Sequence, residues 1–391
     1  MVIRKLRADE NEKAFAVRSL GYGFSIDVRQ KALEPLKDEV IGAFLNDGET
    51  LIAIVYILEY KSSFCGSFYP CLGIGGVAAL PEYRRLGAIR AIMDEIFKMA
   101  PERGWLTSFL HPFSYDYYRQ FGYERLVKRI RLCADSDVLR TCPRNTNVQL
   151  YSYKNKNILQ DILQVYNTYA KSYCGMFFRD EKVKAYNPDP FVSGQHTYVH
   201  YNREQKPDAV ATIEVFDEDK VNVKEICYID PAGIQGMLGF LRMYDGQVNE
   251  FIFETLPEDS EVDLLLSEYS KVSYTVHSRA MGRVMLLKDL LKRNVYPKEA
   301  GHFRLRCEDT QEYNRGVWDV AYESGTATVT KLPGDGPYDI SASVPALSRL
   351  ILQGGYTPHR AAYLETVKIN GDAADFFRAF PDRNLFIPDF F

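Results

Sequence analysis

The sequence predicts a mixed α/β protein of the α+β class that is built from three units. Its 391 residues exceed the ~150 residues of a typical single domain. Predicted strands and amphipathic helices follow one another in an order that occurs twice, before the texture of the sequence changes near residue 286. We therefore expect units at residues 1–146, 147–285 and 286–391.

The composition restricts the class of protein before any motif is considered. Apolar residues make up 46% of the chain and charged residues 26%, which is typical of folded globular proteins. The net charge of -4 is too small to predict binding to nucleic acid or to an anionic membrane. The longest apolar run, Leu51 to Leu58, is far below the ~20 residues of a membrane span. The first residues lead into polar sequence instead of the apolar core of a signal peptide, so a cytoplasmic location is expected.

The cysteines and histidines indicate neither a disulfide framework nor a metal site. The seven cysteines are odd in number and form no C-x-x-C pair, which favours reduced and mostly buried thiols. The six histidines show no H-E-x-x-H or other ligand spacing. We expect no metal.

The first unit opens with a predicted β-hairpin and a glycine-rich strand. Val40 to Leu45 and Leu51 to Leu58 flank Asn46-Asp47-Gly48, a sequence typical of tight turns. Both runs are apolar on both faces, which predicts strands that are covered on both sides. The next predicted strand, Cys71 to Ala79, has glycine at positions 73, 75 and 76. Glycine is unusual in a strand unless the strand bulges or something approaches its backbone closely.

An amphipathic helix and a further strand complete the pattern of the first unit. Apolar residues recur every three or four positions from about residue 85 to residue 100, and charged residues fill the other side of this predicted helix. Trp105 to Leu110 is the next predicted strand.

The second unit repeats this order of elements in weaker form. A helix through Ile158 and Tyr169 precedes strands at Ala209 to Phe216 and Val221 to Ile229. Pro231 begins a helical stretch, and Val248 to Glu254 returns as a strand. The repetition lies in the order and spacing of elements and not in residue identity, and it indicates an internal duplication.

The third unit has short alternating strands and then helices. The strands are predicted at Phe303 to Cys307, Val317 to Ala321 and Ala327 to Lys331, and a helix at Leu347 to Gln353 ends at Gly354-Gly355. A short helix near Ala373 to Phe380 leads to the final stretch, Leu385 to Phe391, which is unusually apolar for a chain end.

The turn Arg84-Arg85-Leu86-Gly87-Ala88-Ile89-Arg90 lies between the glycine-rich strand and the amphipathic helix. A helix start offers free backbone N–H groups and the positive end of the helix dipole, which suits a pyrophosphate. A glycine allows close approach, and arginines add charge-assisted hydrogen bonds. Taken alone, an Arg pair of this kind is more often a solvated helix start.

The longer stretch Val77-Ala78-Ala79-Leu80-Pro81-Glu82-Tyr83-Arg84-Arg85-Leu86-Gly87 resembles the acyl-CoA-binding motif of the GNAT superfamily of N-acetyltransferases. The resemblance implies acetyl-CoA as co-substrate, with pantetheine contacts from the backbone of Val77, Ala78 and Ala79. It implies pyrophosphate contacts from Arg85, Leu86, Gly87, Ala88, Ile89 and Arg90. Ile89 departs from the Gly or Ala that many members have there. Phe113 and Ser114 fall where a second cofactor segment lies.

Tyr118 stands four residues ahead of the pair Gly122-Tyr123. In GNAT enzymes a tyrosine with this spacing lies beside the thioester sulfur, so the resemblance implies that Tyr118 protonates the departing thiolate. A phenol can do so when the pair is desolvated. Because the chain has 27 tyrosines, the alternative is that Tyr118 is a packing aromatic.

The tandem units, the third unit and the aromatic chain end together resemble the Eis-type (enhanced intracellular survival) acetyltransferases. The resemblance implies tandem GNAT folds followed by a sterol-carrier-protein-like α+β domain, and a homo-oligomer, namely a hexamer. It also implies that the C-terminal carboxylate, here on Phe391, accepts the proton of the substrate ammonium. The apolar tail independently favours docking of the chain end, although docking for packing alone would give the same pattern.

The second unit lacks the cations of the first. Between Asp230-Pro231 and Leu241 there is no Arg or Lys, so nothing there would neutralise a pyrophosphate, and we expect no CoA binding. For the whole chain, the resemblance implies acetyl transfer to primary amines of a polycationic small molecule such as an aminoglycoside. Two alternatives stay open, namely acetylation of protein or peptide lysine, and a non-catalytic protein that binds acyl-CoA or lipid.

Overall fold

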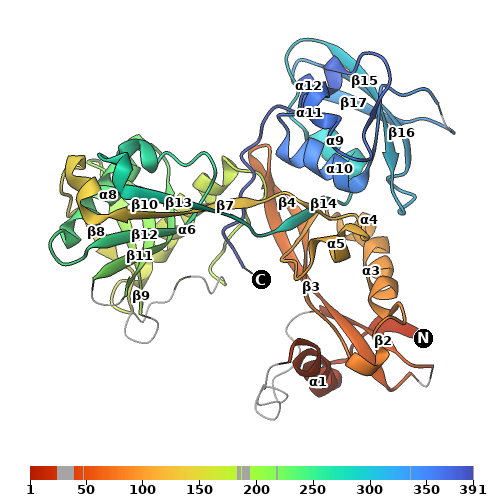
Figure 1. Cartoon of the computed structure of the whole chain (residues 1–391), viewed down its shortest axis with the longest axis horizontal. Coiled ribbons are helices and arrows are strands. Elements are labelled where there is room, and N and C mark those ends of the chain that lie inside the picture. The colour runs from red at the N-terminus through yellow and green to blue at the C-terminus, as the bar shows by residue number, and fades with distance from the viewer. Residues whose placement is uncertain are drawn as a thin grey trace.

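The computed structural model describes residues 1–23, 39–46, 48–182, 186, 194–216, 219–334 and 336–390. Three lobes, each with its own β-sheet, make up the molecule, and the C-terminal tail runs between the first two (Figure 1). The described residues form two seven-stranded sheets and one five-stranded sheet. The predicted mixed α/β class is confirmed.

The first sheet has the strand order β1-β2-β3-β4-β5-β14-β6. Helix α1 packs on one face, where Val40 and Phe44 meet Ala14, and helix α3 packs on the other, where Ile41 and Ala43 lie. Neighbouring residues of one strand thus face different helices, and this confirms the prediction of strands covered on both sides. The bounds are β1 Val2–Lys5, β2 Glu39–Phe44, β3 Leu51–Phe64, β4 Ser67–Ala79, β5 Thr107–Leu110, β14 Met281–Val284, β6 Glu124–Arg125, α1 Asn11–Tyr22, α3 Ala88–Lys98, α4 Ala100–Arg103 and α5 Tyr115–Arg119.

The predicted hairpin is the antiparallel pair β2 and β3, in which Val40 lies opposite Tyr56. Gly48 of its turn has a φ of 72°, a left-handed value that favours glycine. Asp47 of the same turn lies outside the described residues.

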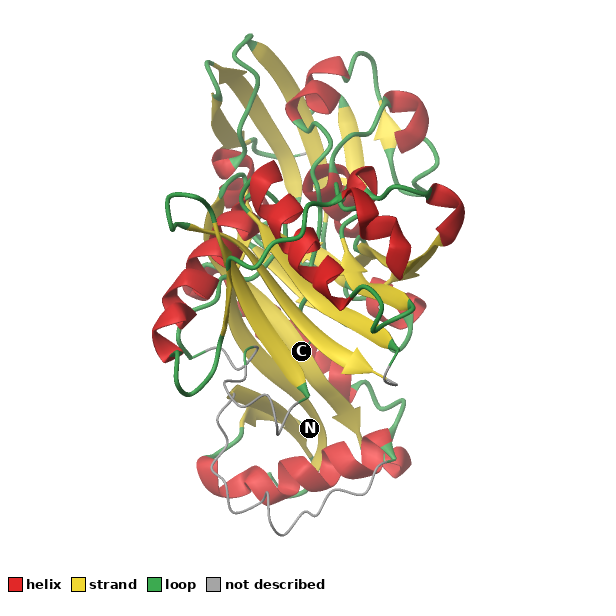
Figure 2. Cartoon of the chain, turned by 90° about the vertical axis from the view of Figure 1, so that its left-hand side faces the viewer, coloured by secondary structure: helices red, strands yellow, loops and turns green. Residues whose placement is uncertain are grey.

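The second sheet has the order β13-β7-β12-β11-β10-β9-β8 and faces the viewer in Figure 2. Its β10–β11 pair contains a register shift at Thr212/Ile213, which parallels the shift at Ile54/Tyr56 between β3 and β4 of the first sheet. The internal duplication therefore extends to the position of a β-bulge. The bounds are β7 Lys128–Asp135, β8 Val148–Leu150, β9 Gln195–Tyr201, β10 Pro207–Phe216, β11 Lys220–Tyr228, β12 Glu250–Leu256, β13 Val272–Ser278, α6 Leu159–Lys171 and α8 Pro231–Leu241.

The first two lobes exchange a strand. Strand β7 follows the first lobe in sequence but lies between β12 and β13 in the second sheet. Strand β14 follows the second lobe in sequence but lies between β5 and β6 in the first sheet. The sheets therefore do not separate at residues 146 and 285, where the sequence suggested boundaries, because each sheet needs a strand from across the junction.

The third lobe has a five-stranded sheet in the order β17-β16-β15-β18-β19. The helix predicted at Leu347 to Gln353 is a helix followed by a π-helical turn, Arg349–Gln353, and it ends at Gly354 and Gly355, both with a φ of 68°. No helix of the described residues is long and apolar enough to cross a membrane. The bounds are α9 Leu287–Arg293, β15 Gly301–Glu308, β16 Gly316–Glu323, β17 Thr326–Lys331, β18 Ile340–Ser343, α10 Val344–Ser348, α11 Pro358–Ala361, β19 Lys368–Ile369 and α12 Ala374–Ala379.

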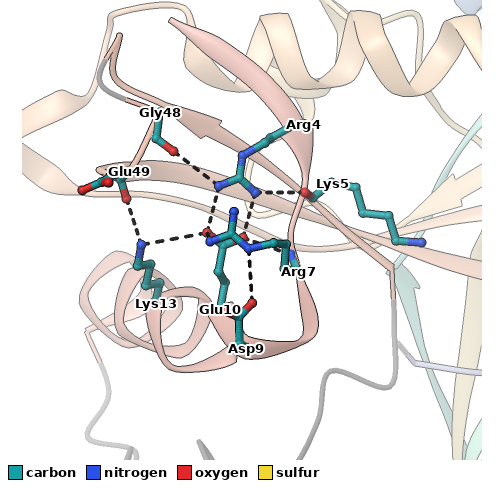
Figure 3. A network of polar contacts seen from close by, with 8 residues as sticks. All are labelled: Arg4, Lys5, Arg7, Asp9, Glu10, Lys13, Gly48 and Glu49. Carbon is teal, nitrogen blue, oxygen red and sulfur yellow. Dashed lines mark hydrogen bonds and ion pairs between the residues drawn. The ribbon is translucent and has the colours of Figure 1, made fainter.

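A network of charged side chains fixes the start of α1 against β1 (Figure 3). The carboxylate of Glu10 accepts hydrogen bonds from Arg4 Nη1 at 2.7 Å and Arg4 Nη2 at 2.8 Å, and from the backbone N–H of Arg7 at 2.9 Å. The Arg4 guanidinium also lies 3.7 Å from the centroid of the Phe44 ring. Because Glu10 is only 2% exposed, it depends on these partners for its charge.

The C-terminal tail is docked along part of its length. Phe386 and Ile387 are buried, whereas Phe390 is 79% exposed. The docking that the apolar tail favours is therefore seen at Phe386 and Ile387, while Phe390 is mostly exposed and contacts the His111 ring, with centroids 4.6 Å apart. Phe391, on which the predicted catalytic carboxylate falls, lies outside the described residues.

Candidate active site

The site forms where two parallel strands separate. Strands β4 and β5 pair from Cys71 opposite Thr107 to Ile74 opposite Leu110, and β5 ends there while β4 continues to Ala79. The backbone of residues 75–79 therefore has an edge that β5 does not cover. Such an edge offers N–H and C=O groups to an extended ligand.

The glycines of β4 have two separate causes. Gly76 has a φ of 55° in the bulge, and a Cβ placed there would lie 2.3 Å from Tyr56 Cδ2. A Cβ on Gly73 would lie 2.7 Å from Tyr60 Cε2 on the neighbouring strand. The sequence left a bulge and close approach as alternatives, and both occur: the bulge is at Gly76, and the atoms that approach are those of cross-strand tyrosine rings. Of the predicted pantetheine contacts, Val77 lies in the bulge beside Gly76, and Ala78 and Ala79 lie just past it.

The turn before α3 adopts left-handed conformations at Arg85, with φ 66°, and at Gly87, with φ 77°. For this reason the helix that the sequence predicts from about residue 85 begins at Ala88. No acidic residue stands in the first turn of α3, and Arg85, Leu86 and Gly87 are exposed. The first N–H groups of a helix have no intrahelical acceptor, so this turn is able to bind an anion.

The three arginines of the turn differ in the contacts that their side chains make. Arg84 donates from Nη2 to the backbone oxygen of Gly21 at 3.3 Å. Arg90 donates to the side-chain oxygen of Gln120 and lies 5.4 Å from the centroid of the Phe121 ring. Arg85 points to no hydrogen-bond acceptor among the described residues, which leaves its guanidinium available to a phosphate.

Tyr118 lies on α5, the short helix that follows β5. Ser114 caps this helix, because its Oγ accepts the backbone N–H of Tyr117 at 3.3 Å. The Tyr118 ring is 3% exposed and makes edge contacts with Tyr117 and Phe113, with centroids 5.2 and 5.5 Å apart. Phe113 itself is 72% exposed. Phe113 and Ser114 thus support Tyr118 from the helix start.

The Tyr118 hydroxyl has no hydrogen-bond partner within the described part of the chain. Burial, followed by the neighbouring Tyr22, Tyr117 and Tyr123, raises the pKa of Tyr118 well above its ordinary value. The side chain is therefore a neutral phenol at physiological pH, with an O–H group free to donate to a ligand.

His111 is the first residue after β5. This place at the end of a strand is the only sequence feature that could have indicated it. Its Nδ1 lies 3.3 Å from the carbonyl oxygen of Arg279 and its Nε2 lies 3.1 Å from that of Asp389. Burial and the nearby Arg129 lower the pKa of His111. A neutral imidazole has one N–H, so it donates to one of these carbonyls at a time.

Arg129 is a buried cation beside the chain end, and no sequence pattern indicated it. Its side chain donates from Nη2 to the carbonyl oxygen of Asp389 at 2.9 Å, and its buried Nε has no acceptor among the described residues. Burial and the nearby Arg279 lower the pKa of Arg129 to about 10. The side chain is still charged at neutral pH, so the site holds a cation that lacks a full counter-charge.

In the second lobe, the helix start that corresponds to that of α3 is the start of α8, and it is blocked to an anion. The Asp230 carboxylate caps α8 by accepting the backbone N–H of Gly233 at 2.9 Å. A Cβ on Gly236 would lie 2.3 Å from His200 Nε2, so α8 lies close against its sheet. A carboxylate at a helix start occupies the place of an anion and repels phosphate. Among the described residues, no cluster of His, Cys, Asp and Glu could hold a metal ion.

Two family models match the chain. Both describe an acetyltransferase (GNAT) domain, one over residues 2–126 and the other over residues 175–284. No curated protein matches the chain.

Solved structures with the same fold cover the whole chain. A probable N-acyltransferase of Enterococcus faecalis V583 is 22% identical with a TM-score of 0.84, and the match covers 100% of this chain and 99% of that one. A GCN5-related N-acetyltransferase of Anabaena variabilis is 17% identical with a TM-score of 0.80, and Eis1 of Mycobacterium abscessus is 19% identical with a TM-score of 0.79. Both matches cover 100% of each chain. The three-lobed architecture is therefore shared along its full length.

Proposed function

We propose that this chain, which belongs to the GNAT acetyltransferases through both of its matched domains, transfers the acetyl group of acetyl-CoA to a primary amine of a polycationic small molecule of the aminoglycoside kind. The observation that carries the proposal is the combination of a free strand edge at residues 75–79, an acid-free helix start at Ala88 and a free phenol at Tyr118. All three lie in the first lobe, around the point where β4 and β5 separate.

The first lobe fits acetyl-CoA in two places. The backbone at and past the bulge, from Val77 to Ala79, would pair with the amide groups of the pantetheine arm. The turn from Arg85 to Arg90 would hold the pyrophosphate, because its N–H groups and the α3 dipole favour negative charge. Leu86, Gly87, Ala88 and Ile89 complete this turn.

The transfer is direct. The amine nitrogen attacks the thioester carbonyl carbon and the carbon–sulfur bond breaks, so that an amide and a thiolate form. The Tyr118 hydroxyl donates its proton to the thiolate, and general acid catalysis of this kind contributes ~10²–10⁴-fold to rate. The attacking nitrogen loses a proton to a base, for which we propose the C-terminal carboxylate of Phe391.

The neighbourhood of Asp389 supports that assignment. Phe391 follows Asp389 by two residues, a span of at most ~7 Å, and both His111 and Arg129 contact the Asp389 backbone. The incompletely paired cation on Arg129 would be balanced by a carboxylate at this point. A nearby cation keeps a carboxylate ionised, and the ionised form both attracts an ammonium group and accepts its proton.

One observation favours a second acceptor class. Arg129 and Arg279 both lie by His111 at the chain end, and cations there favour an acceptor that carries a carboxylate next to its amine. A lysine next to an acidic residue in a protein or peptide would meet that requirement. An aminoglycoside, which carries only cationic groups, would instead depend on the Phe391 carboxylate.

A thiol-release assay with acetyl-CoA tests the function. The acceptors are an aminoglycoside panel, polyamines and lysine peptides, each run beside the variant Tyr118→Phe. We expect thiol release with at least one amine and a loss of at least 100-fold in the variant. Binding of CoA or lipid without any acetyl transfer to the panel would contradict the proposal and favour a non-catalytic carrier. The proposed hexamer is tested separately by the mass of the assembly in solution.

A further inference from the structure

Asp389 is held from two sides by different lobes. Its backbone carbonyl oxygen accepts a hydrogen bond from Arg129 Nη2 at 2.9 Å, on β7 where the chain passes from the first lobe to the second, and lies 3.1 Å from Nε2 of His111 in the first lobe. Its carboxylate faces the second lobe, where Arg179 Nη2 lies 2.7 Å from Oδ1 and the Tyr166 hydroxyl lies 3.2 Å from Oδ2. One residue of the tail therefore bridges both lobes, two positions before the chain end.

The arginine that receives this carboxylate is buried and fixed. Arg179 is 5% exposed, and its guanidinium lies 3.7 Å from the centroid of the Tyr166 ring. Arg179 also pairs with Glu225, with Nη2 2.9 Å from Oε1 and Nη1 2.9 Å from Oε2. A planar guanidinium held by a carboxylate and an aromatic face keeps a single orientation, so it is a rigid support for the tail.

The segment before Arg179 connects this support to the first lobe. The backbone N–H groups of Gly175 and Phe178 donate to the carbonyl oxygens of Ser63 and Lys61 on β3, both at 2.8 Å. On its other side the segment pairs with the tail, because Phe386 N–H donates to the carbonyl oxygen of Cys174 at 2.9 Å. The segment therefore runs along the first lobe, while the backbone of Arg179 itself is hydrogen-bonded to Asn167 on α6 of the second lobe.

The residue that orients Arg179 comes directly after the β-bulge of the second lobe. Glu225 follows the bulge of β11 and lies opposite Thr212, just as Ala78 follows the bulge of β4 and lies opposite Ile54. In the first lobe this position is Ala78, which has a small side chain and lies at the free strand edge. In the second lobe it carries the carboxylate that orients Arg179.

We propose that Asp389 is a positioning residue, which fixes the chain end in the active site of the first lobe through the anchor formed by Arg179, Tyr166 and Glu225 of the second lobe. This inference rests on the proposed acetyl transfer. It gives the second GNAT domain a task that does not involve CoA, since that domain holds the tail from which the reactive chain end extends.

The test uses Asp389→Asn in the full-length protein. This substitution removes the charge but keeps the shape, and Arg179 still has Glu225 as its partner, so the variant is expected to fold. The control is Asp208→Asn, which breaks another buried carboxylate contact of the second lobe, Asp208 Oδ1 to His200 Nδ1 at 2.5 Å. Tyr166→Phe, which removes only the weaker contact to Asp389, serves as a milder second variant.

Turnover is the first readout. We expect Asp389→Asn to lower kcat/KM for the amine at least tenfold and to leave the KM for acetyl-CoA within twofold, with Tyr166→Phe intermediate and Asp208→Asn within twofold of the original chain. A loss of equal size in Asp389→Asn and Asp208→Asn would overturn the proposal, since it would reflect general destabilisation. Unchanged turnover in Asp389→Asn would also overturn it.

Digestion with carboxypeptidase Y, followed by mass spectrometry, is the second readout and needs no activity. Release of the last two residues should be at least tenfold faster in Asp389→Asn than in the original chain or in Asp208→Asn. Equal rates would overturn the anchor even if acetyl transfer is established. If the original chain acetylates no amine but the release rates differ as expected, the proposed function fails and the anchor stands. Faster release with unchanged turnover would show that the anchor does not position the reaction.

Discussion

Replacing Glu10 by Gln should weaken α1 in a manner that depends on pH. Glu10 is 2% exposed, and the pKa of its carboxyl is lowered to about 2 from 4.5, mainly because Arg4 donates two hydrogen bonds to it. The contact between Arg4 and the start of α1 therefore depends on the ionised form of Glu10.

The size of the effect follows from linkage. A carboxyl whose pKa is lower in the folded state stabilises that state above the unfolded pKa and loses this contribution as pH falls toward the folded pKa. The two pKa values of Glu10 differ by about 2.5, and at 1.36 kcal/mol per pH unit this corresponds to about 3 kcal/mol at pH 7. At pH 3 the same relation leaves about 1.4 kcal/mol. Glu10→Gln should therefore cost more at pH 7 than at pH 3.

Native-state hydrogen exchange of the α1 amides measures this cost locally, which is necessary because a three-lobed chain need not unfold in one step. The control is Glu95→Gln, which breaks the exposed pair of Glu95 with Lys98 at 3.1 Å and should cost less than ~0.5 kcal/mol at either pH. A cost of Glu10→Gln that is equal at both pH values would refute the reasoning. A cost below ~1 kcal/mol at pH 7 would show that Arg4 and Arg7 do not stabilise the charge as their geometry suggests.

Three further outcomes are expected. Tyr118→Phe should lower kcat ~10²–10⁴-fold. The melting temperature should stay within ~2 °C, because removal of the hydroxyl leaves no partner unsatisfied. A large drop in melting temperature would assign the hydroxyl a structural role. Arg85→Ala should raise the KM for acetyl-CoA about tenfold and leave kcat unchanged. A tenfold change corresponds to the loss of one charge-assisted hydrogen bond of ~1.4 kcal/mol. Steady-state kinetics that show no change in KM would remove Arg85 from the pyrophosphate site. Calorimetry should find one CoA per chain, and two would contradict the closing role of Asp230.

The elements could be predicted from the sequence because their signals are local. The apolar runs of β2 and β3, the period of α3 and the glycines of β4 each report on their own backbone. The strand exchange could not be predicted. Strands β7 and β14 are short segments whose pairing depends on partners more than 100 residues away, and a strand pattern does not state which sheet it joins.

The site was predictable where a motif carried it and not elsewhere. Gly87 and Tyr118 were identified by spacing, and the structure adds the left-handed turn at Gly87 and the free hydroxyl of Tyr118. Arg129 and Arg179 had no signal, because a buried cation looks like any other arginine in a sequence with 48 basic residues. Their roles come from the path of the tail, which only the folded chain reveals.

The exchanged strands give the second lobe a structural role in the first. Strand β14 completes the first sheet between β5 and β6, and β6 leads from α5, which carries Tyr118. Arg283 of β14 also donates to the carbonyl oxygen of Phe121 at 2.7 Å, and a Cβ on Gly122 would lie 1.5 Å from its Nη1. The turn after the helix that carries Tyr118 is thus held on one side by a strand that the chain reaches only after it has built the second lobe. Removing the second lobe would therefore leave the first sheet incomplete next to Tyr118, in addition to releasing the tail that Arg179 anchors.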